Sequence, residues 1–311
     1  MIYTCTLNPA IDLFVETDDL LPSKVNRTQS EDYQANGKGV NVSIILKKLG
    51  ISSTALGFKA GFTGAYIQDE LHAMGIDTDF VEIDGVTRVN IFVHTGEQEY
   101  KIVNRGPKVD LHAHNEMIEK INSLPDESTL FVSGSAPRGV DESIYKEIAK
   151  IAFDKQIDLI LDISSEVLMD CLQYNPFLIK PNKEELAHFY GKEDLTEDDI
   201  IYYGHDLLDK GAKHVLISLG EDGAIYIDKD HLLKVSSPEG KVINTACAGD
   251  TMLAMFYQKM QVGFSVEDSM IYASAAGSST AFSKGLSDLE DISELIKQIN
   301  TINLKGGKTN E

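Results

Sequence analysis

The sequence predicts an α/β fold with a central, mostly parallel sheet flanked by helices, from which a small second β-sheet projects. From about residue 124 to residue 219, short apolar segments alternate with amphipathic helical segments. Continuous apolar strands separated by helices are typical of a parallel sheet that is buried on both faces. The N-terminal third differs, because half-polar β segments dominate there with little helix between them. We therefore expect residues 1–311 to form one α/β domain with a β-sheet lid.

The main sheet is predicted from four apolar segments that are bounded by polar or turn-forming residues. We expect its strands at residues 129–133, 158–162, 177–179 and 213–218. We expect helices at residues 142–153 and 200–210 between them. Short strand–helix–strand crossovers of this kind are right-handed, which favours a doubly covered parallel sheet.

The lid is predicted from four segments at residues 11–16, 27–34, 87–94 and 97–103. Gly96 supports a hairpin between the last two segments. We expect the lid strands at about residues 11–35 and 87–104, where a projecting sheet would cover a ligand or a partner subunit. The alternative is an ordinary antiparallel edge of the main sheet.

The chain is strongly acidic, with 28 Lys and Arg against 49 Asp and Glu, so that its net charge is 28 − 49 = −21. A field of this sign repels nucleic acid and anionic lipid, and neither is an expected partner. The sequence shows no basic leader and no apolar run of about 20 residues. Three widely spaced cysteines fit a reducing compartment. We therefore expect a cytoplasmic location.

Arginine is rare and unevenly placed in this lysine-rich chain. There are four arginines, all within the first 138 residues: Arg27, Arg88, Arg105 and Arg138. The planar guanidinium group binds phosphate through two parallel hydrogen bonds, which lysine cannot do. The clustering therefore indicates a site for a phosphorylated ligand, with chance placement or surface ion pairing as the alternative.

The segment at residues 244–251, Asn-Thr-Ala-Cys-Ala-Gly-Asp-Thr, follows a β-like stretch at 241–243 and leads into an amphipathic helix at 252–262. Small residues at a helix start leave backbone N–H groups free to bind an anion, and the helix dipole adds to the attraction. Asp250 in this turn could take the proton from an attacking hydroxyl group. For this segment alone, the favoured interpretation is that Asp250 is simply a helix N-cap or an acidic residue of the first turn.

A second glycine-rich turn, Ala-Asn-Gly-Lys-Gly-Val-Asn at residues 35–41, opens a helix predicted at 42–49. Its spacing differs from that of the phosphate-binding loop of nucleotide hydrolases. Backbone amides and Lys38 could nevertheless hold an anion here. Taken alone, this turn is weak evidence.

Two further turns follow predicted strands. The turn at residues 217–224 contains two glycines at the end of a strand, where a nucleotide would lie in a parallel sheet. Taken alone, a tight β-turn is the favoured interpretation. At residues 179–185, Asn182 and Glu185 lie on one face of a helix start. Their oxygens could hold Mg²⁺ through water, or they could form a capping box.

These segments, taken in order, resemble the signatures of the ribokinase-like carbohydrate kinases, the PfkB family, over roughly residues 2–300. The matching segments are Thr-Leu-Asn-Pro-Ala-Ile-Asp at 6–12, Asn-Gly-Lys-Gly-Val-Asn at 36–41, Lys-Pro-Asn-x-x-Glu at 180–185, Ser-Leu-Gly-x-x-Gly at 218–223 and the segment at 244–250. Several motifs in one order are far more specific than any one of them. The resemblance implies a ribokinase-like fold, a kinase that uses ATP and Mg²⁺, and Asp250 as the general base.

Features of a subgroup are also present. The Asn-Pro-x-x-Asp start at 8–12, Thr-Arg-x-Asn at 87–90, Gly106-Pro107 after Arg105, and Asn244 resemble 1-phosphofructokinase and tagatose-6-phosphate kinase. The resemblance therefore implies phosphorylation of a ketohexose phosphate, with fructose 1-phosphate to fructose 1,6-bisphosphate as the first expectation. Tagatose-6-phosphate kinase is the alternative, and a non-catalytic sugar-phosphate-binding regulator is a further one. The resemblance also implies a homodimer through the lid.

The resemblance assigns roles residue by residue. For catalysis it implies Asp250 with the neighbouring Gly249, Ala248 and Cys247. For substrate binding it implies Asp12, Gly37, Lys38, Gly39, Asn41, Arg88, Asn90, Arg105 and Ser135, with Arg27 as an addition. For ATP it implies Lys180, Asn182, Ser218, Gly220, Gly223 and Gly249, and for the metal Asn182 and Glu185 through water.

Two positions depart from the family signatures. Cys247 stands where the family usually has the first glycine of Gly-Ala-Gly-Asp, and glycine tolerates positive φ and leaves room for phosphate. Asn36 stands at the first glycine of Gly-Gly-Lys-Gly-x-Asn, and Asn is the non-glycine residue that best tolerates left-handed backbone geometry. We expect Cys247 to reshape the anion site, and activity to survive because the amides of residues 248–250 remain.

Overall fold

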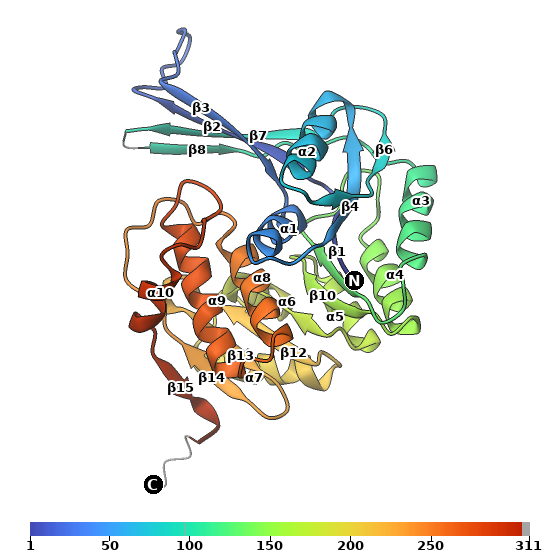
Figure 1. The fold of residues 1–311 in the computed structure, drawn as a ribbon, viewed down its shortest axis with the longest axis vertical. Helices are drawn as coiled ribbons and strands as arrows, with labels where there is room; N and C mark the ends of the chain where they lie inside the picture. Colours follow the sequence, from blue (N-terminus) through green and yellow to red (C-terminus); the bar gives the residue numbers. More distant parts are fainter. Residues whose placement is uncertain (97, 307–311) are drawn as a thin grey trace.

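The structure, a computed structural model, describes residues 1–96 and 98–306, so that Glu97 of the expected lid and the last five residues lie outside it. A large mixed sheet forms the centre of the molecule (Figure 1). Its strands are, in spatial order, β15 (Thr301–Asn303), β14 (Leu232–Val235), β13 (Ala224–Ile227), β12 (His214–Ser218), β11 (Leu178–Ile179), β10 (Asp158–Asp162), β9 (Thr129–Ser133), β1 (Ile2–Thr6), β4 (Thr54–Ala60) and β5 (Asp77–Thr78), with β6 (Val81–Ile83) beside β4.

The strands from β12 across to β4 pair in parallel, whereas β13, β14 and β15 continue the sheet antiparallel. All four strands predicted for the main sheet are present, and two of them, β9 and β10, span the predicted residues. The predicted helices are α4 (Ser143–Asp154) and α7 (Glu197–Asp209). The expectation of a mostly parallel α/β sheet is therefore confirmed.

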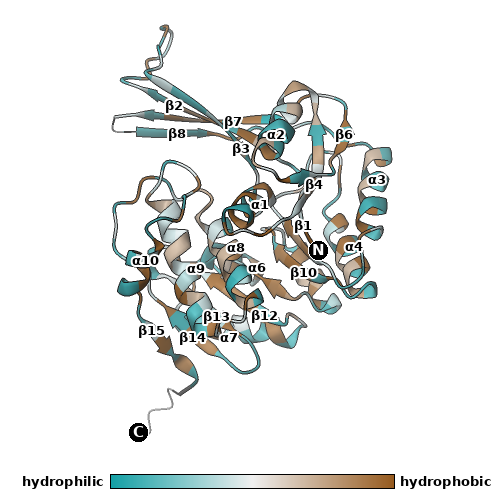
Figure 2. Ribbon diagram, viewed as in Figure 1, coloured by the Kyte–Doolittle hydropathy of each residue, from teal (hydrophilic) through white to brown (hydrophobic). Residues whose placement is uncertain are grey.

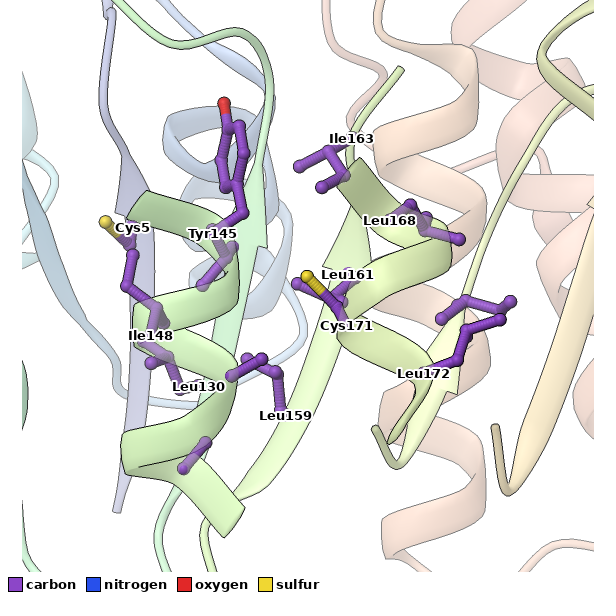
Figure 3. Close-up of a cluster of buried hydrophobic side chains, with 14 of the residues drawn as sticks. Cys5, Leu130, Tyr145, Ile148, Leu159, Leu161, Ile163, Leu168, Cys171 and Leu172 are labelled. Atoms are coloured by element: carbon purple, nitrogen blue, oxygen red, sulfur yellow. The ribbon is translucent and has the colours of Figure 1, made fainter. Parts of the chain in front are cut away.

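Helices cover both faces of this sheet, and the alternation of side chains along each strand divides the core between them. Phe131 of β9 packs with α1 (Lys38–Lys48), α8 (Ala248–Gln261) and α9 (Val266–Ala281) on one face. Its neighbours Leu130 and Val132 pack with the helices of the other face, which are α3 (Leu111–Asn122), α4, α5 (Val167–Cys171), α6 (Lys183–Phe189) and α7. Figure 2 shows the apolar strands enclosed between the two helical layers. Figure 3 shows part of the hydrophobic cluster that contains Leu130 and Val132, where Ile148 of α4 and Cys171 of α5 lie against the strands.

The small sheet is separate from the main sheet and projects from it (Figure 1). Its strand order is β3 (Ser30–Asn36), β2 (Ala10–Thr17), β7 (Arg88–Thr95) and β8 (Gln98–Ile102). Strands β2 and β7 pair in parallel and the outer two pairs are antiparallel. The four predicted segments therefore form a sheet of their own, and the alternative of an edge on the main sheet is wrong.

Three local predictions are wrong. Strand β4 and helix α2 (Gly61–Ala73) lie between β3 and β7 and were not predicted, because the start of α2 is rich in glycine and lacks a strong apolar period. Residues 241–243 form no strand, and Val242 and Ile243 are exposed. Helices α1 and α8 begin four residues earlier than predicted, which places Lys38 and Asp250 inside their first turns.

Gly223 is required by the turn between β12 and β13. Its φ is +92°, and a Cβ atom there would lie 1.9 Å from the carbonyl oxygen of Val235. We expect Gly223→Ala to lower the free energy of unfolding by at least about 3 kcal/mol, because backbone strain and a backbone clash add. Urea unfolding without nucleotide measures this change.

The matched control is Gly220→Ala in the same turn. Gly220 also has a positive φ of +61°, but no heavy atom of the described chain lies within 4 Å of the added Cβ. It should cost only about 1 to 2 kcal/mol, which is the left-handed strain alone. Equal unfolding midpoints for the two variants would contradict the clash.

Candidate active site

The heads of two helices meet at the carboxyl ends of the parallel strands. Asn41 in the first turn of α1 donates a hydrogen bond from Nδ2 to Asp250 Oδ2 in the first turn of α8, over 2.8 Å. Lys38, the first residue of α1, reaches Asp162 at the end of β10 with 2.8 Å between Nζ and Oδ1. Ligands bind at this end of the strands in open α/β sheets.

Asp250 is buried, with 5% of its surface exposed, and is the third residue of α8. The helix N-cap is Cys247, so Asp250 is not the cap but an acidic residue of the first turn, as the other half of that interpretation expected. Burial raises the pKa of Asp250 to about 7, the charge of Asp162 adds to the increase, and Lys38 opposes it. A carboxyl group with a pKa near neutrality is suited to accept a proton from a hydroxyl group.

Asp162 is the second carboxylate of this centre. It is 1% exposed. Its Oδ2 lies 3.3 Å from Lys180 Nζ, and its Oδ1 contacts Lys38. Burial alone would raise its pKa, but Lys180 and Lys38 outweigh burial and lower it. Asp162 was absent from the residues predicted for the site. The signal that could have found it is an acidic residue closing a buried apolar strand.

The lysines of the centre are held close to the head of α8. A Cβ atom on Gly249 would lie 3.1 Å from Lys180 Nζ, so this ammonium group sits against the helix start. Burial opposes the charge of Lys38, but Asp162, Glu185 and Asp250 outweigh it and raise the pKa of Lys38. Within the described residues, the N–H groups of Gly249 and Asp250 have no backbone acceptor, whereas that of Ala248 contacts Thr245 O at 3.4 Å. This helix start therefore remains open to an anion.

A cavity of about 600 Å³ lies at the junction of the small sheet with the main sheet, lined by residues 86–89, 103–106 and Arg138. Three of the four arginines, Arg88, Arg105 and Arg138, therefore gather at one site. Arg88 donates to the carbonyl oxygen of Asn8 from Nε and Nη2. Every ion pair among the described residues uses lysine or histidine, so none of these guanidinium groups is neutralised by a carboxylate of the chain.

Arg138 was noted among the arginines but not assigned to the substrate. Its Nε donates to Gly106 O over 3.0 Å, which orients the group beside the cavity. Two cationic residues that the resemblance assigned to the substrate do not line this cavity. Arg27 is exposed in the loop between β2 and β3, and Lys38 forms an ion pair with Asp162.

Asp12 and Asn90 face each other across the parallel strands β2 and β7. Asn90 Nδ2 donates to Asp12 Oδ1 over 2.8 Å, and both residues are buried. Burial raises the pKa of Asp12, against the lowering effects of Asn90 and Arg88. The small sheet thus places a carboxylate and an amide next to the arginine cavity. Ser135 is exposed in the loop after β9.

Gly37 and Gly39 allow the head of α1 to pack on β1. A Cβ atom on Gly37 would lie 2.6 Å from Thr6 Cγ2, and one on Gly39 would lie 2.7 Å from Thr6 Oγ1. The residue with a positive φ in this turn is Gly37, at +138°. Asn36 is the last residue of β3 and does not have a positive φ. Asn36 therefore does not need to adopt left-handed geometry, whereas Cys247 does adopt it, with φ 65°.

The residues expected at the nucleotide lie at the ends of β11 and β12. Ser218 N donates to Pro181 O over 3.1 Å, which brings Ser218 beside Asn182. Gly220 and Gly223 form the turn that follows β12. Ser218 and this turn therefore lie at the same edge of the sheet as Lys180, which follows β11.

Asn182 and Glu185 form a capping box at the start of α6. Asn182 Oδ1 accepts from Glu185 N over 2.7 Å, and Glu185 Oε2 accepts from Asn182 N over 3.0 Å. The second carboxylate oxygen, Oε1, lies 3.7 Å from Lys38 Nζ. Among the described residues there is no cluster of three or more His, Cys, Asp or Glu that could hold a metal ion by itself. These side chains suit Mg²⁺ that is carried by phosphate and reached through water.

Known proteins resemble this chain over nearly its whole length. The chain matches the pfkB family of carbohydrate kinases over residues 5–292. It is 54% identical to D-tagatose-1-phosphate kinase of Bacillus licheniformis, across 98% of this chain and 100% of that protein. It is 33% identical to 1-phosphofructokinase of Bacillus subtilis, again across 98% and 100%.

Solved structures show the same fold. Phosphofructokinase-2 from Escherichia coli in complex with substrates and products superposes with a TM-score of 0.89 at 28% identity, covering 95% of this chain and 98% of that one. Ribokinase from Arabidopsis thaliana shares the fold, with a TM-score of 0.75 at 21% identity over 95% and 98%. Among the described residues, none of the helices combines the length and apolar character needed to cross a bilayer. The chain belongs to the pfkB family of carbohydrate kinases.

Proposed function

We propose that this kinase transfers a phosphoryl group from ATP to the free primary hydroxyl group of a ketohexose 1-phosphate. Tagatose 1-phosphate is the preferred acceptor in this proposal, and fructose 1-phosphate is the second. The single observation that carries it is the pairing of a buried, near-neutral carboxyl group, Asp250, with a cavity whose arginines have no carboxylate partner. The relative at 54% identity, named D-tagatose-1-phosphate kinase, favours tagatose over fructose.

Asp250 acts as the general base in this proposal. Its carboxylate accepts the proton of the acceptor hydroxyl group, while Asn41 holds Oδ2 in place. The N–H groups at the start of α8 and the ammonium group of Lys180 stabilise the charge of the transferring phosphoryl group. Mg²⁺ would neutralise the phosphates of ATP, with Glu185 and Asn182 reaching it through water.

The substrate phosphate occupies the arginine cavity in this proposal. Arg88 is fixed by backbone carbonyl groups, and Arg138 is fixed by Gly106. Both are thereby oriented before an anion arrives, which lowers the entropy lost on binding. Asp12 and Asn90 then bind sugar hydroxyl groups between the cavity and the α8 head. The −21 charge of the chain makes such local cations necessary.

ADP release with four acceptors tests the function. We expect the fastest turnover with tagatose 1-phosphate, slower turnover with fructose 1-phosphate, and much lower kcat/KM with tagatose 6-phosphate and fructose 6-phosphate. Asp250→Asn should lower kcat roughly a thousandfold or more because the base is lost, while the KM for the sugar stays nearly unchanged.

Three outcomes oppose the proposal. Near-normal turnover in the Asp250→Asn variant would remove Asp250 as the base. A higher kcat/KM with a ketohexose 6-phosphate than with the 1-phosphates would contradict the proposed substrate class. Tight sugar-phosphate binding without ADP release from the unmodified protein would indicate a regulator on a kinase scaffold.

Arg138→Ala tests the phosphate cavity. It should raise the KM for the ketohexose 1-phosphate roughly 10- to 100-fold, since a charge-assisted hydrogen bond is lost. Arg138→Lys should recover part of the loss, because it keeps the charge but not the fork. The slow turnover of unphosphorylated tagatose serves as the control and should not change. An equal loss with both sugars would show that Arg138 does not act on the phosphate.

We propose that the small sheet is a lid over the sugar and that its outer face binds a second copy of the chain. Tyr33, Tyr100 and Ile102 are exposed, and their strand registers place them on one face with Leu13, Ile91 and Val93. All described residues of β8 are exposed, so this edge and face lack a cover in the single chain. A free apolar sheet face of this kind favours association.

Light scattering tests the dimer. The protein should have twice its chain mass of 34.2 kDa, and Ile102→Asp should convert it to a monomer, because a charge would be buried in the interface. Phe62→Asp is the control, since Phe62 is also apolar and is even more exposed than Ile102, but lies on α2, outside the small sheet. A monomeric unmodified protein would overturn this part of the proposal.

A further inference from the structure

The two departures from the family signatures lie against each other. Asn36 at the end of β3 donates from Nδ2 to Cys247 Sγ at the head of α8, over 3.5 Å. The two residues are separated by 211 positions in the chain. Two glycines at these positions would have no side-chain atoms to make this contact. The departures are therefore one structural feature and not two.

Asn41 connects this pair to Asp250. Its Nδ2 lies 3.1 Å from Asn36 Oδ1, 3.1 Å from Cys247 Sγ and 2.8 Å from Asp250 Oδ2. An amide nitrogen surrounded by three acceptors cannot be exchanged with its oxygen, because the oxygen would then face acceptors only. Asn36 and Cys247 thus fix which end of the Asn41 amide faces the base.

The other end of that amide has no partner. Asn41 Oδ1 is buried without a hydrogen-bond donor among the described residues, and the residue is 1% exposed. A buried carbonyl oxygen without a donor is costly unless a ligand supplies one. Among the described residues the amide is therefore held by its nitrogen alone, through Asn36, Cys247 and Asp250.

The backbone at Cys247 supports a role for its side chain. With φ 65°, Cys247 adopts a conformation that a residue with a Cβ atom rarely occupies. Such strain persists only where neighbouring contacts determine it, and it gathers at functional sites. The contacts present here are the two asparagine amides.

We propose that Asn36 and Cys247 are a coupled pair of positioning residues that orient the Asn41 carboxamide, so that its Nδ2 holds the base Asp250 in place. The inference rests on the proposed function of Asp250. The thiol is suited to the task because burial raises the pKa of Cys247, with Asp250 adding to it, so that the sulfur is neutral beside the carboxylate. The bulk of the thiol also keeps water away from Asp250.

A double-mutant cycle tests the coupling. Asn36→Gly and Cys247→Gly should each lower kcat roughly tenfold, because the amide becomes free to turn. Coupled residues are not additive, so the double variant should lose about tenfold and not about a hundredfold. Cys247→Ser keeps an acceptor and should recover most of the rate.

The pH profile of kcat provides a readout that a purely structural role would not move. The groups that face Asp250 are Asp162, Lys38, Lys180 and Cys247, and all but the last are retained in these variants. In the unmodified protein kcat should fall as pH drops through about 7, since protonated Asp250 cannot accept a proton. Cys247→Gly admits water, which lowers the pKa of Asp250, so this acidic limb should move about 0.5 to 1 pH unit lower.

Controls separate the possible failures. Cys171→Ala, in the hydrophobic cluster of Figure 3, should leave both kcat and the acidic limb of its pH profile unchanged. Melting temperatures confirm that each variant is folded. Independent losses that multiply in the double variant, together with an unmoved acidic limb, would overturn the pair, even if Asp250→Asn is inactive. An active Asp250→Asn variant would instead overturn the function on which the pair rests.

Discussion

The site depends on the buried ion pairs of Asp162 with Lys38 and Lys180. They join the head of α1 to the ends of β10 and β11, at the edge of the sheet where the strands end. A buried carboxylate requires such partners, and two lysines keep Asp162 ionised. The charge of Asp162 in turn adds to the burial that raises the pKa of Asp250. Two neighbouring carboxyl groups are thereby separated into a fixed anion and a proton acceptor.

The distribution of cations follows from the overall charge. A chain with a net charge of −21 repels the phosphates that a sugar-phosphate kinase must bind. It places two lysines beside the helix start and three arginines around one cavity. The lysines are balanced by Asp162, whereas Arg88 and Arg138 are hydrogen-bonded to carbonyl oxygens, which orient them without an ion pair. The two groups are therefore suited to different phosphates.

Much of the fold could be predicted because buried strands carry a local signal. Strands β9 and β10 are apolar runs with polar ends, and their bounds follow directly. Residues 241–243 have the same local character but remain exposed, since burial depends on what packs above them. Asp250 could be predicted from the order of the motifs. Asp162 carries a local signal as the acidic end of an apolar strand, but its pairing with Lys38 and Lys180 could not be predicted, because it depends on which strand ends lie together in space.

Cys247 shows how a departure from a signature can be accommodated. Its thiol lies toward Asn36 and Asn41, while the N–H groups of Gly249 and Asp250 keep no backbone acceptor. The thiol thus lies on the side of the helix start that faces the two asparagine amides. The side with the N–H groups of Gly249 and Asp250 stays open to an anion. Glycine at this position in relatives avoids strain, but it would leave Asn41 with one acceptor fewer. In the proposed pair, the contacts of the thiol with Asn36 and Asn41 help to hold the strained backbone of Cys247.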